Sequence, residues 1–358
     1  MKTAAARLLP ALIAVMVGFG PAATAESRRH FDGPYHVTIT PLERVRATVT
    51  STFRFPGLDA QEWWAAFPWP SEFEGQPSAR VQVRIAEAPF AEAGQITDES
   101  ALRQPLVALH WFPDGNDATH ILTAEATYEV TITRRTLAPG AASTPVRRLT
   151  PAERSGFLAA TAHFDFSSSR FQAWLRKEGL RRKSDERDLD FAHRAMETLV
   201  RTHTYRSELR SNRSASAVCA SGWSDCGGLA TIYVSILRAN GIPARCLTGR
   251  SIDPNTTHVK MDFYADDVGW VPGDPAVAIG SQRANAGFGR EHFDMLITHF
   301  DLVRLSGKYQ WLQGIATLQA LNSSGIGGRI TFDHAMRVEV LPLENGPTPA
   351  ASPAVEPQ

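Results

Sequence analysis

Apolar and polar residues alternate along much of the first third of the chain. Three stretches show this pattern: residues 45–55, 81–85 and 124–132. A period of two places one face of a strand in a core and leaves the other in solvent, which is typical of antiparallel sheets. Turn-forming residues such as Pro56-Gly57 separate the stretches. Several short strands with this spacing predict a β-sandwich in the N-terminal part of the chain.

An aromatic cluster lies within this region, between Trp63 and Trp69. Its rings have the chemistry to stack on a carbohydrate. However, large aromatic side chains dominate the burial of apolar surface in proteins. We therefore predict that the cluster packs between the sheets or at the domain junction.

A helical period replaces the alternation after a stretch rich in Ala, Pro, Gly and Ser at residues 138–143. Thr150, Pro151 and Glu153 have the order of a capping box with proline at the first helical position. Further along, five apolar residues share one helical face: Leu229, Ile232, Tyr233, Ile236 and Leu237. This helix is expected to end near Asn240-Gly241, because glycine commonly follows the last residue of a helix.

The first 25 residues have the pattern of a secretion signal. Lys2 and Arg7 give a positive start, residues 8–18 are apolar, and Ala23-Thr24-Ala25 is a small-x-small cleavage site. The apolar stretch is too short to span a bilayer, for which about 20 residues are needed. We therefore expect an exported protein, periplasmic or extracellular, with no transmembrane segment in the mature chain. An uncleaved anchor is the alternative.

Composition excludes several classes of protein. The chain has 37 Lys and Arg against 37 Asp and Glu, and removal of the signal leaves a formal charge of −2. No basic excess is present to neutralise phosphates, so no nucleic-acid partner is expected. Hydrophobic residues make up 43% of the 358, too many for a disordered chain. Only the proline-rich residues 345–358 are predicted to be a disordered tail.

Cys226 lies at the start of the helix predicted above. Free N–H groups and the helix dipole at a first turn stabilise an anion, which favours a nucleophilic thiolate. Gly227 and Gly228 follow it and leave room for a substrate backbone. The alternatives are a buried structural thiol or a disulfide with Cys219 or Cys246, whereas a Cys219–Cys246 bridge would leave Cys226 free.

A nucleophilic thiol needs a base, and the base needs a group that orients it. His258 begins an alternating stretch, and a polar turn at residues 265–269 leads to a second stretch that ends near Asp274, a pattern that predicts a hairpin. A hairpin can hold an imidazole beside a carboxylate of the next strand, as in a Cys-His-Asp triad. Asp262 is a rival orienting group, but residues four apart along a strand lie about 13 Å apart.

Taken together, these segments resemble the transglutaminase-like superfamily. The resemblance rests on CGGLA at residues 226–230, LRANGIPAR at 237–245, His258, and GWVPGDP at 269–275. It is close over residues 185–280. It implies an α+β fold with a papain-like core, in which a helix bearing the cysteine packs on an antiparallel sheet bearing the histidine and aspartate.

The resemblance also implies roles for individual residues. Cys226 matches the family nucleophile, His258 the general base and acid, and Asp274 the orienting carboxylate. The implied reaction is attack of a thiolate on an amide carbonyl, with a thioacyl-enzyme that passes its acyl group to water or to an amine. The Cys226 backbone N–H is the expected oxyanion donor. The Trp223 indole is a second candidate donor, unless its ring only packs.

Two residues depart from the family pattern. Lys260 stands where an aromatic residue is usual, and Asp262 replaces a common Glu. We expect these two residues and Gly227 to line the substrate cleft. Lys260 would then either favour acidic substrates or mark a site that has lost activity.

The sequence as a whole therefore predicts an α+β protein in five parts. These are a signal peptide (1–25), a β-sandwich (26–140), a linker with a helical segment (141–184), a transglutaminase-like domain whose sheet the C-terminal strands complete (185–344) and the tail (345–358). The predicted activity is cysteine-dependent acyl transfer or hydrolysis on peptide or protein amides. No cofactor and no metal is expected. A cell-envelope polymer is a further candidate partner, and a non-catalytic binding or scaffold protein on the same fold is the alternative function.

Overall fold

The computed structural model describes most of the chain between residues 31 and 342. The described ranges are 31–54, 59–86, 92–97, 104–112, 121–207, 212–252, 256–301, 320–326 and 331–342. The predicted signal peptide and the predicted tail lie outside the described residues. No helix among the described residues is long and apolar enough to cross a membrane.

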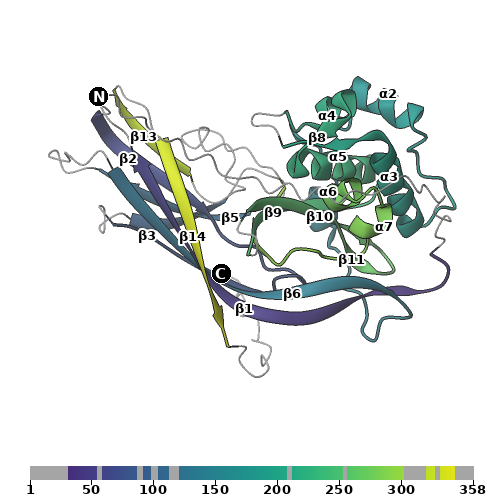
Figure 1. Ribbon diagram of the computed structural model, residues 1–358, viewed down its shortest axis with the longest axis horizontal. Helices are drawn as coiled ribbons and strands as arrows, with labels where there is room; N and C mark the ends of the chain where they lie inside the picture. Colours follow the sequence, from purple (N-terminus) through teal and green to yellow (C-terminus); the bar gives the residue numbers. More distant parts are fainter. Residues whose placement is uncertain are drawn as a thin grey trace, which may run out of the picture. The chain divides into compact units, whose positions relative to one another are not determined.

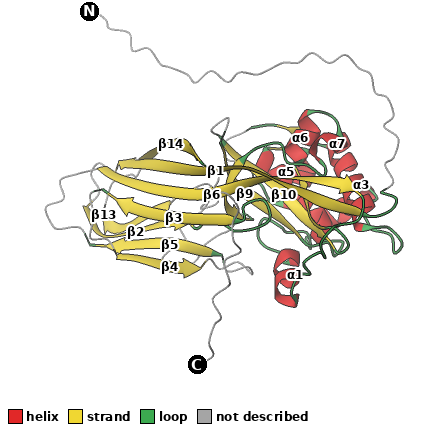
Figure 2. Cartoon of the chain, turned by 90° about the horizontal axis from the view of Figure 1, so that it is seen from below, coloured by secondary structure: helices red, strands yellow, loops and turns green. Residues whose placement is uncertain are grey.

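Two four-stranded antiparallel sheets pack face to face and form the predicted sandwich (Figure 1, Figure 2). Their strands are β1 (Tyr35–Arg54), β2 (Asp59–Pro68), β3 (Ser78–Ile85), β4 (Glu92–Thr97), β5 (Pro105–Trp111), β6 (Ile121–Pro139), β13 (Ala320–Ile326) and β14 (Thr331–Leu341). One sheet has the order β14-β1-β6-β3, and the other has the order β13-β2-β5-β4.

The alternating residues of β1 and β6 fill the space between these sheets. Val45 and Val49 of β1 and Tyr128 of β6 have no exposed surface. Trp63 and Phe67 of β2 pack in the same cluster from the opposite sheet. These two members of the aromatic cluster therefore pack between the sheets, as predicted.

The two C-terminal strands belong to the sandwich, which corrects the boundary drawn at 185–344. β14 pairs with β1 over its whole length, and β13 pairs with β2. Met336 and Val338 of β14 pack on the core of the sandwich. The alternating pattern of a strand is the same whichever free sheet edge it joins. The sequence pattern therefore could not show which of the sheets these strands extend.

The remaining elements form a second layered unit. Its sheet contains β9 (Ala244–Ser251), β10 (Thr257–Ala265), β11 (Gly269–Gly273) and β12 (Met295–Phe300), and a short parallel pair contains β7 (Thr204–Tyr205) and β8 (Trp223–Ser224). Its helices are α1 (Pro151–Leu158), α2 (Ser169–Lys177), α3 (Asp188–Thr202), α4 (Ala215–Ser221), α5 (Cys226–Arg238), α6 (Pro275–Gly280) and α7 (Ala284–Gly287). The sheet order is β11-β10-β9-β12. The β10–β11 hairpin and the capping box of Thr150 and Glu153 are confirmed.

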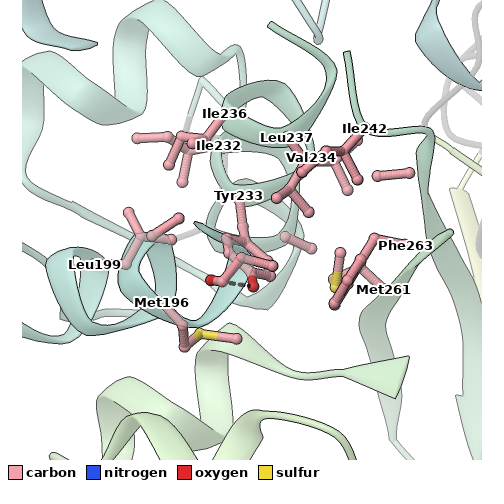
Figure 3. Close-up of a cluster of buried hydrophobic side chains, with 14 of the residues drawn as sticks. Met196, Leu199, Ile232, Tyr233, Val234, Ile236, Leu237, Ile242, Met261 and Phe263 are labelled. Carbon is pink, nitrogen blue, oxygen red and sulfur yellow. Dashed lines mark hydrogen bonds between the residues drawn. The ribbon is translucent and has the colours of Figure 1, made fainter. Parts of the chain in front are cut away.

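Helix α5 is buried along almost its whole length. Its apolar residues pack between α3 and β10, and the Tyr233 hydroxyl donates to the Ala192 carbonyl at 2.8 Å (Figure 3). The helix ends at Arg238, and Gly241 follows with a φ of +78°, which glycine adopts without steric cost. A helix held in this way fixes the position of any side chain on its first turn.

Strand β6 joins the sandwich to the second sheet. Beyond the sandwich core it runs beneath β11 (Figure 1), and the Leu137 N–H donates to the Gly289 carbonyl at 2.6 Å. The Arg135 side chain of β6 has no exposed surface and bonds Asp262 of β10 at 2.9 Å. The sandwich and the second layered unit are therefore linked by buried polar contacts.

Candidate active site

Cys226 is the first residue of α5. The Asp225 side chain caps the helix by accepting the Gly228 N–H at 3.1 Å. The cap leaves the first turn ordered, with its remaining N–H groups directed outward beside the partly exposed Cys226 thiol. The thiol thus lies where the helix dipole stabilises a negative charge.

His258 and Asp274 come together across the β10–β11 hairpin. The distance between His258 Nε2 and Asp274 Oδ2 is 2.7 Å. The other carboxylate oxygen, Oδ1, accepts the N–H groups of Ala276 and Val277 and so caps α6. Asp274 is only 2% exposed, so the helix cap holds the carboxylate rigidly against the imidazole. Asp262, the rival orienting group, does not bond His258.

The pKa of His258 reflects both partners. Burial alone would lower it, but hydrogen bonds with Asp274 and Cys226, together with the negative charges of these groups, raise the pKa to about 9. The imidazolium is therefore the favoured form at neutral pH. A positively charged ring between a thiol and a carboxylate is the arrangement that stabilises a thiolate.

Three further residues at this site were not identified from the sequence. Arg213 bonds Asp225 through Nε at 3.0 Å and through Nη2 at 2.5 Å. The hydrogen bond to Asp225 raises the pKa of Arg213, burial lowers it, and the charges of Asp225 and then Cys226 raise it further. Tyr205 is 46% exposed, and its pKa is raised by burial and then by the charges of Cys226, Asp225 and Asp274. Asp directly before a helix start is a recognisable cap, but nothing local in the sequence marks Arg213 or Tyr205.

The two glycines after Cys226 have different surroundings. A Cβ at Gly228 would lie 2.0 Å from Ser224 Oγ and 2.7 Å from Ser224 Cβ. A Cβ at Gly227 would meet only the Arg213 side chain, with Cδ and Nε at 3.0 Å. The Arg213 side chain therefore lies across Gly227, the residue that follows Cys226.

This difference predicts opposite responses to alanine. Gly228→Ala should lower the free energy of unfolding by roughly 1–3 kcal/mol, because the buried Ser224 cannot yield without strain. Gly227→Ala should leave it unchanged or raise it by up to about 1 kcal/mol, because alanine favours a helix and the partly exposed Arg213 can shift. Urea unfolding of both variants and of the wild type measures the two changes in the free energy of unfolding. Equal losses would contradict the described packing.

Lys260 and Asp262 do not line a cleft, contrary to the expectation from the sequence. Asp262 is fully buried and bonds Arg245 Nε at 2.8 Å in addition to Arg135. Lys260 is 5% exposed, and its Nζ lies 2.9 Å from Glu291 Oε1. Both side chains lie on the face of β10 opposite to Val259 and Met261, which pack in the core with α5, and both are paired with residues of other segments.

The cysteines form no disulfide. Cys219, Cys226 and Cys246 are all free, so the bridge between Cys219 and Cys246 considered above is not present. Burial, followed by the charge of Asp165, raises the pKa of Cys219 to about 11, and burial raises that of Cys246 well above its ordinary value. Of the three thiols, Cys226 is the one placed beside a histidine.

Trp223 lies on β8, three residues before Cys226. Its ring is partly buried, with the Arg206 guanidinium 5.5 Å from the ring centroid. Its role as an oxyanion donor stays a prediction. The described residues contain no cluster of three or more His, Cys, Asp and Glu side chains that could hold a metal ion.

Comparison with known proteins identifies the domain that carries this site. Residues 177–275 match the family model of the transglutaminase-like superfamily. The chain thus contains a domain of the transglutaminase-like superfamily, which confirms the resemblance seen in its sequence motifs.

Solved structures show similar folds at low sequence identity. A candidate cysteine protease from Cytophaga hutchinsonii is 13% identical, with 87% of this chain and 95% of that chain covered and a TM-score of 0.54. The periplasmic domain of TgpA from Pseudomonas aeruginosa is 14% identical over 67% of this chain and 91% of that chain, with a TM-score of 0.33. LapG from Legionella pneumophila is 16% identical over 42% of this chain and 90% of that chain, with a TM-score of 0.24. None of the curated proteins compared with the chain matches it. The first of these structures shares its fold with this chain across most of both molecules.

Proposed function

We propose that the protein is a cysteine-dependent enzyme that cleaves or transfers the acyl group of peptide or protein amides. The observation that carries the proposal is the His258–Asp274 pair, which lies beside a thiol at the start of a buried helix. Cys226 is the proposed nucleophile, His258 the base and acid, and Asp274 the orienting carboxylate. The transglutaminase-like domain at 177–275 supports this assignment, because it contains all three residues.

The proposed reaction begins with attack of the Cys226 thiolate on the amide carbonyl carbon. A C–S bond forms, and the oxyanion is stabilised by the Cys226 backbone N–H, with the Trp223 indole as a second candidate donor. The His258 imidazolium then gives its proton to the leaving nitrogen as the C–N bond breaks. Water or an amine attacks the thioester, His258 accepts the proton of this second nucleophile, and the thiolate leaves.

Hydrolysis and amine transfer share this thioacyl intermediate. The outcome depends on which second nucleophile the site admits. We propose peptides or proteins at the cell envelope as substrates, in keeping with the predicted secretion signal, and a peptide-bearing cell-envelope polymer belongs to the same chemical class. The non-catalytic alternative rested on Lys260, and the Lys260–Glu291 pair gives that lysine a structural partner instead.

A peptide assay tests the proposal. The full chain is incubated with a glutamine-containing peptide, with and without a labelled primary amine, and the products are resolved by mass spectrometry. Incorporation of the amine indicates transfer, whereas deamidation or backbone cleavage indicates hydrolysis. Cys226→Ala is the control. Turnover in the wild type equal to that of this variant, over a panel of peptides, would rule the proposal out.

A further inference from the structure

Five charged side chains are buried together beneath β10. Arg135 and Asp262 have no exposed surface, and Arg245, Glu291 and Lys260 are at most 7% exposed. They come from β6 of the sandwich, from β9 and β10, and from the segment before β12. Charges are retained at such depth only where each is paired and hydrogen-bonded, so the geometry of this cluster is tightly constrained.

Glu291 is at the centre of one half of the cluster. Its carboxylate accepts the Arg135 backbone N–H at 2.9 Å and Arg135 Nη2 at 3.0 Å, and it lies 2.9 Å from Lys260 Nζ. Burial by itself raises the pKa of Glu291, but the charges of Arg135 and Lys260 and their hydrogen bonds lower it to about 2. Glu291 therefore stays ionised and keeps Lys260 in a single position.

Lys260 connects this cluster to the histidine. Its Nζ also donates to the Phe293 carbonyl at 3.4 Å. The Phe293 ring packs edge-on against the His258 ring, with centroids 4.8 Å apart and an interplanar angle of 65°. Lys260 therefore holds the segment whose aromatic ring packs against the imidazole.

We propose that Lys260, held by Glu291, which Arg135 anchors in turn, is a positioning residue for His258 and acts by fixing the Phe293 ring against the imidazole. An aromatic residue at position 260 would leave Glu291 with one cation fewer and the Phe293 carbonyl without this donor. Lys260, which stands where the family usually has an aromatic residue, thus has a defined partner in Glu291. Through Arg135 the sandwich contributes directly to the order of the site. The catalytic consequence rests on the proposed function, whereas the packing of His258 does not.

Lys260→Met tests this link by removing the charge and keeping the length of the side chain. The first measurement is the NMR resonance of the His258 ring in protein labelled at histidine Cε1, assigned by its loss in His258→Ala. The Phe293 ring current shifts this resonance, so it should move toward the value of an unpacked histidine in Lys260→Met. The second measurement is the rate of Cys226 alkylation by iodoacetamide, which should fall by about tenfold as the imidazole loses its fixed position.

Three further variants complete the test. Lys260→Arg should restore most of the alkylation rate, because its guanidinium can reach Glu291. Phe293→Leu changes no charge and should slow alkylation to a similar extent, so the idea can be tested even if Lys260→Met folds poorly. Arg84→Met removes an exposed pair with Glu125 on the sandwich and should match the wild type.

The outcomes separate the two proposals. An unchanged His258 resonance and alkylation rate in a folded Lys260→Met protein would show that the cluster serves stability alone. A shifted resonance in a protein whose wild-type Cys226 reacts no faster than an ordinary thiol would support positioning while removing the proposed enzyme function.

Discussion

His258→Ala should slow the alkylation of Cys226 by iodoacetamide at pH 7 by about tenfold or more, because a thiol without an ion-pair partner is only a few per cent thiolate at this pH. The structure gives Cys226 such a partner in His258, whose pKa of about 9 keeps it protonated. Peptide mapping by mass spectrometry measures the rate at each cysteine. Cys219 and Cys246 should remain almost unlabelled in both proteins, because burial raises their pKa values.

The matched control for this experiment is His36→Ala. His36 lies on β1 and contacts the Gly140 carbonyl at 3.0 Å, well separated in the sequence from the site. This variant should label at the wild-type rate. Slow labelling of Cys226 that is the same in wild type and His258→Ala would contradict the thiolate–imidazolium pair.

Asp274→Asn should lower turnover by about 10²- to 10⁴-fold, because the imidazole loses the charge that orients it and stabilises its protonated form. The variant keeps an oxygen at Oδ1, so the cap of α6 at Ala276 and Val277 is expected to persist. The loss should therefore appear in kcat with little change in the melting temperature. A matching fall in stability would indicate that Asp274 matters mainly as a helix cap.

Asp274→Asn should also move the pH dependence of turnover toward lower pH. The His258 pKa is raised above its ordinary 6.5, so the stability that protonated His258 contributes to the fold is complete below about pH 6.5 and is lost as the pH rises through about 9. The basic limb of the profile of kcat/KM against pH reports the loss of the His258 proton, which the leaving nitrogen needs. Because Asp274 raises the His258 pKa, Asp274→Asn should move the basic limb of the profile to lower pH. A limb that stays in place would show that Asp274 does not tune the imidazole.

Local sequence patterns were sufficient for the parts of the site that lie close together along the chain. The helix of Cys226 and the hairpin of His258 and Asp274 follow from apolar spacing and turn residues, because such elements form mainly from neighbouring positions. Asp225 was not singled out, although Asp is a favoured residue directly before a helix and could have been recognised as a cap.

Contacts between distant segments were not predictable in this way. Arg135 and Asp262 are 127 positions apart, and no periodicity shows that a basic residue on one strand will neutralise an acidic residue on another. Lys260 was therefore interpreted as facing the substrate, when its partner Glu291 holds it in the interior. The pairing of β14 with β1 and of β13 with β2 was equally unpredictable, because any alternating strand can pair with a free sheet edge.

The pairing of β14 with β1 has a consequence for how the protein is made. The salt bridge between Arg46 and Glu339 joins residues 293 positions apart, and the whole transglutaminase-like domain lies between the two strands in the sequence. Chains generally fold from the N-terminus as they are synthesised, but pairing over such a separation must wait until both strands exist. The β14-β1-β6-β3 sheet thus stays open at the edge of β1 until β14 has been translated, so the sandwich is completed only after the whole domain that it supports has been synthesised.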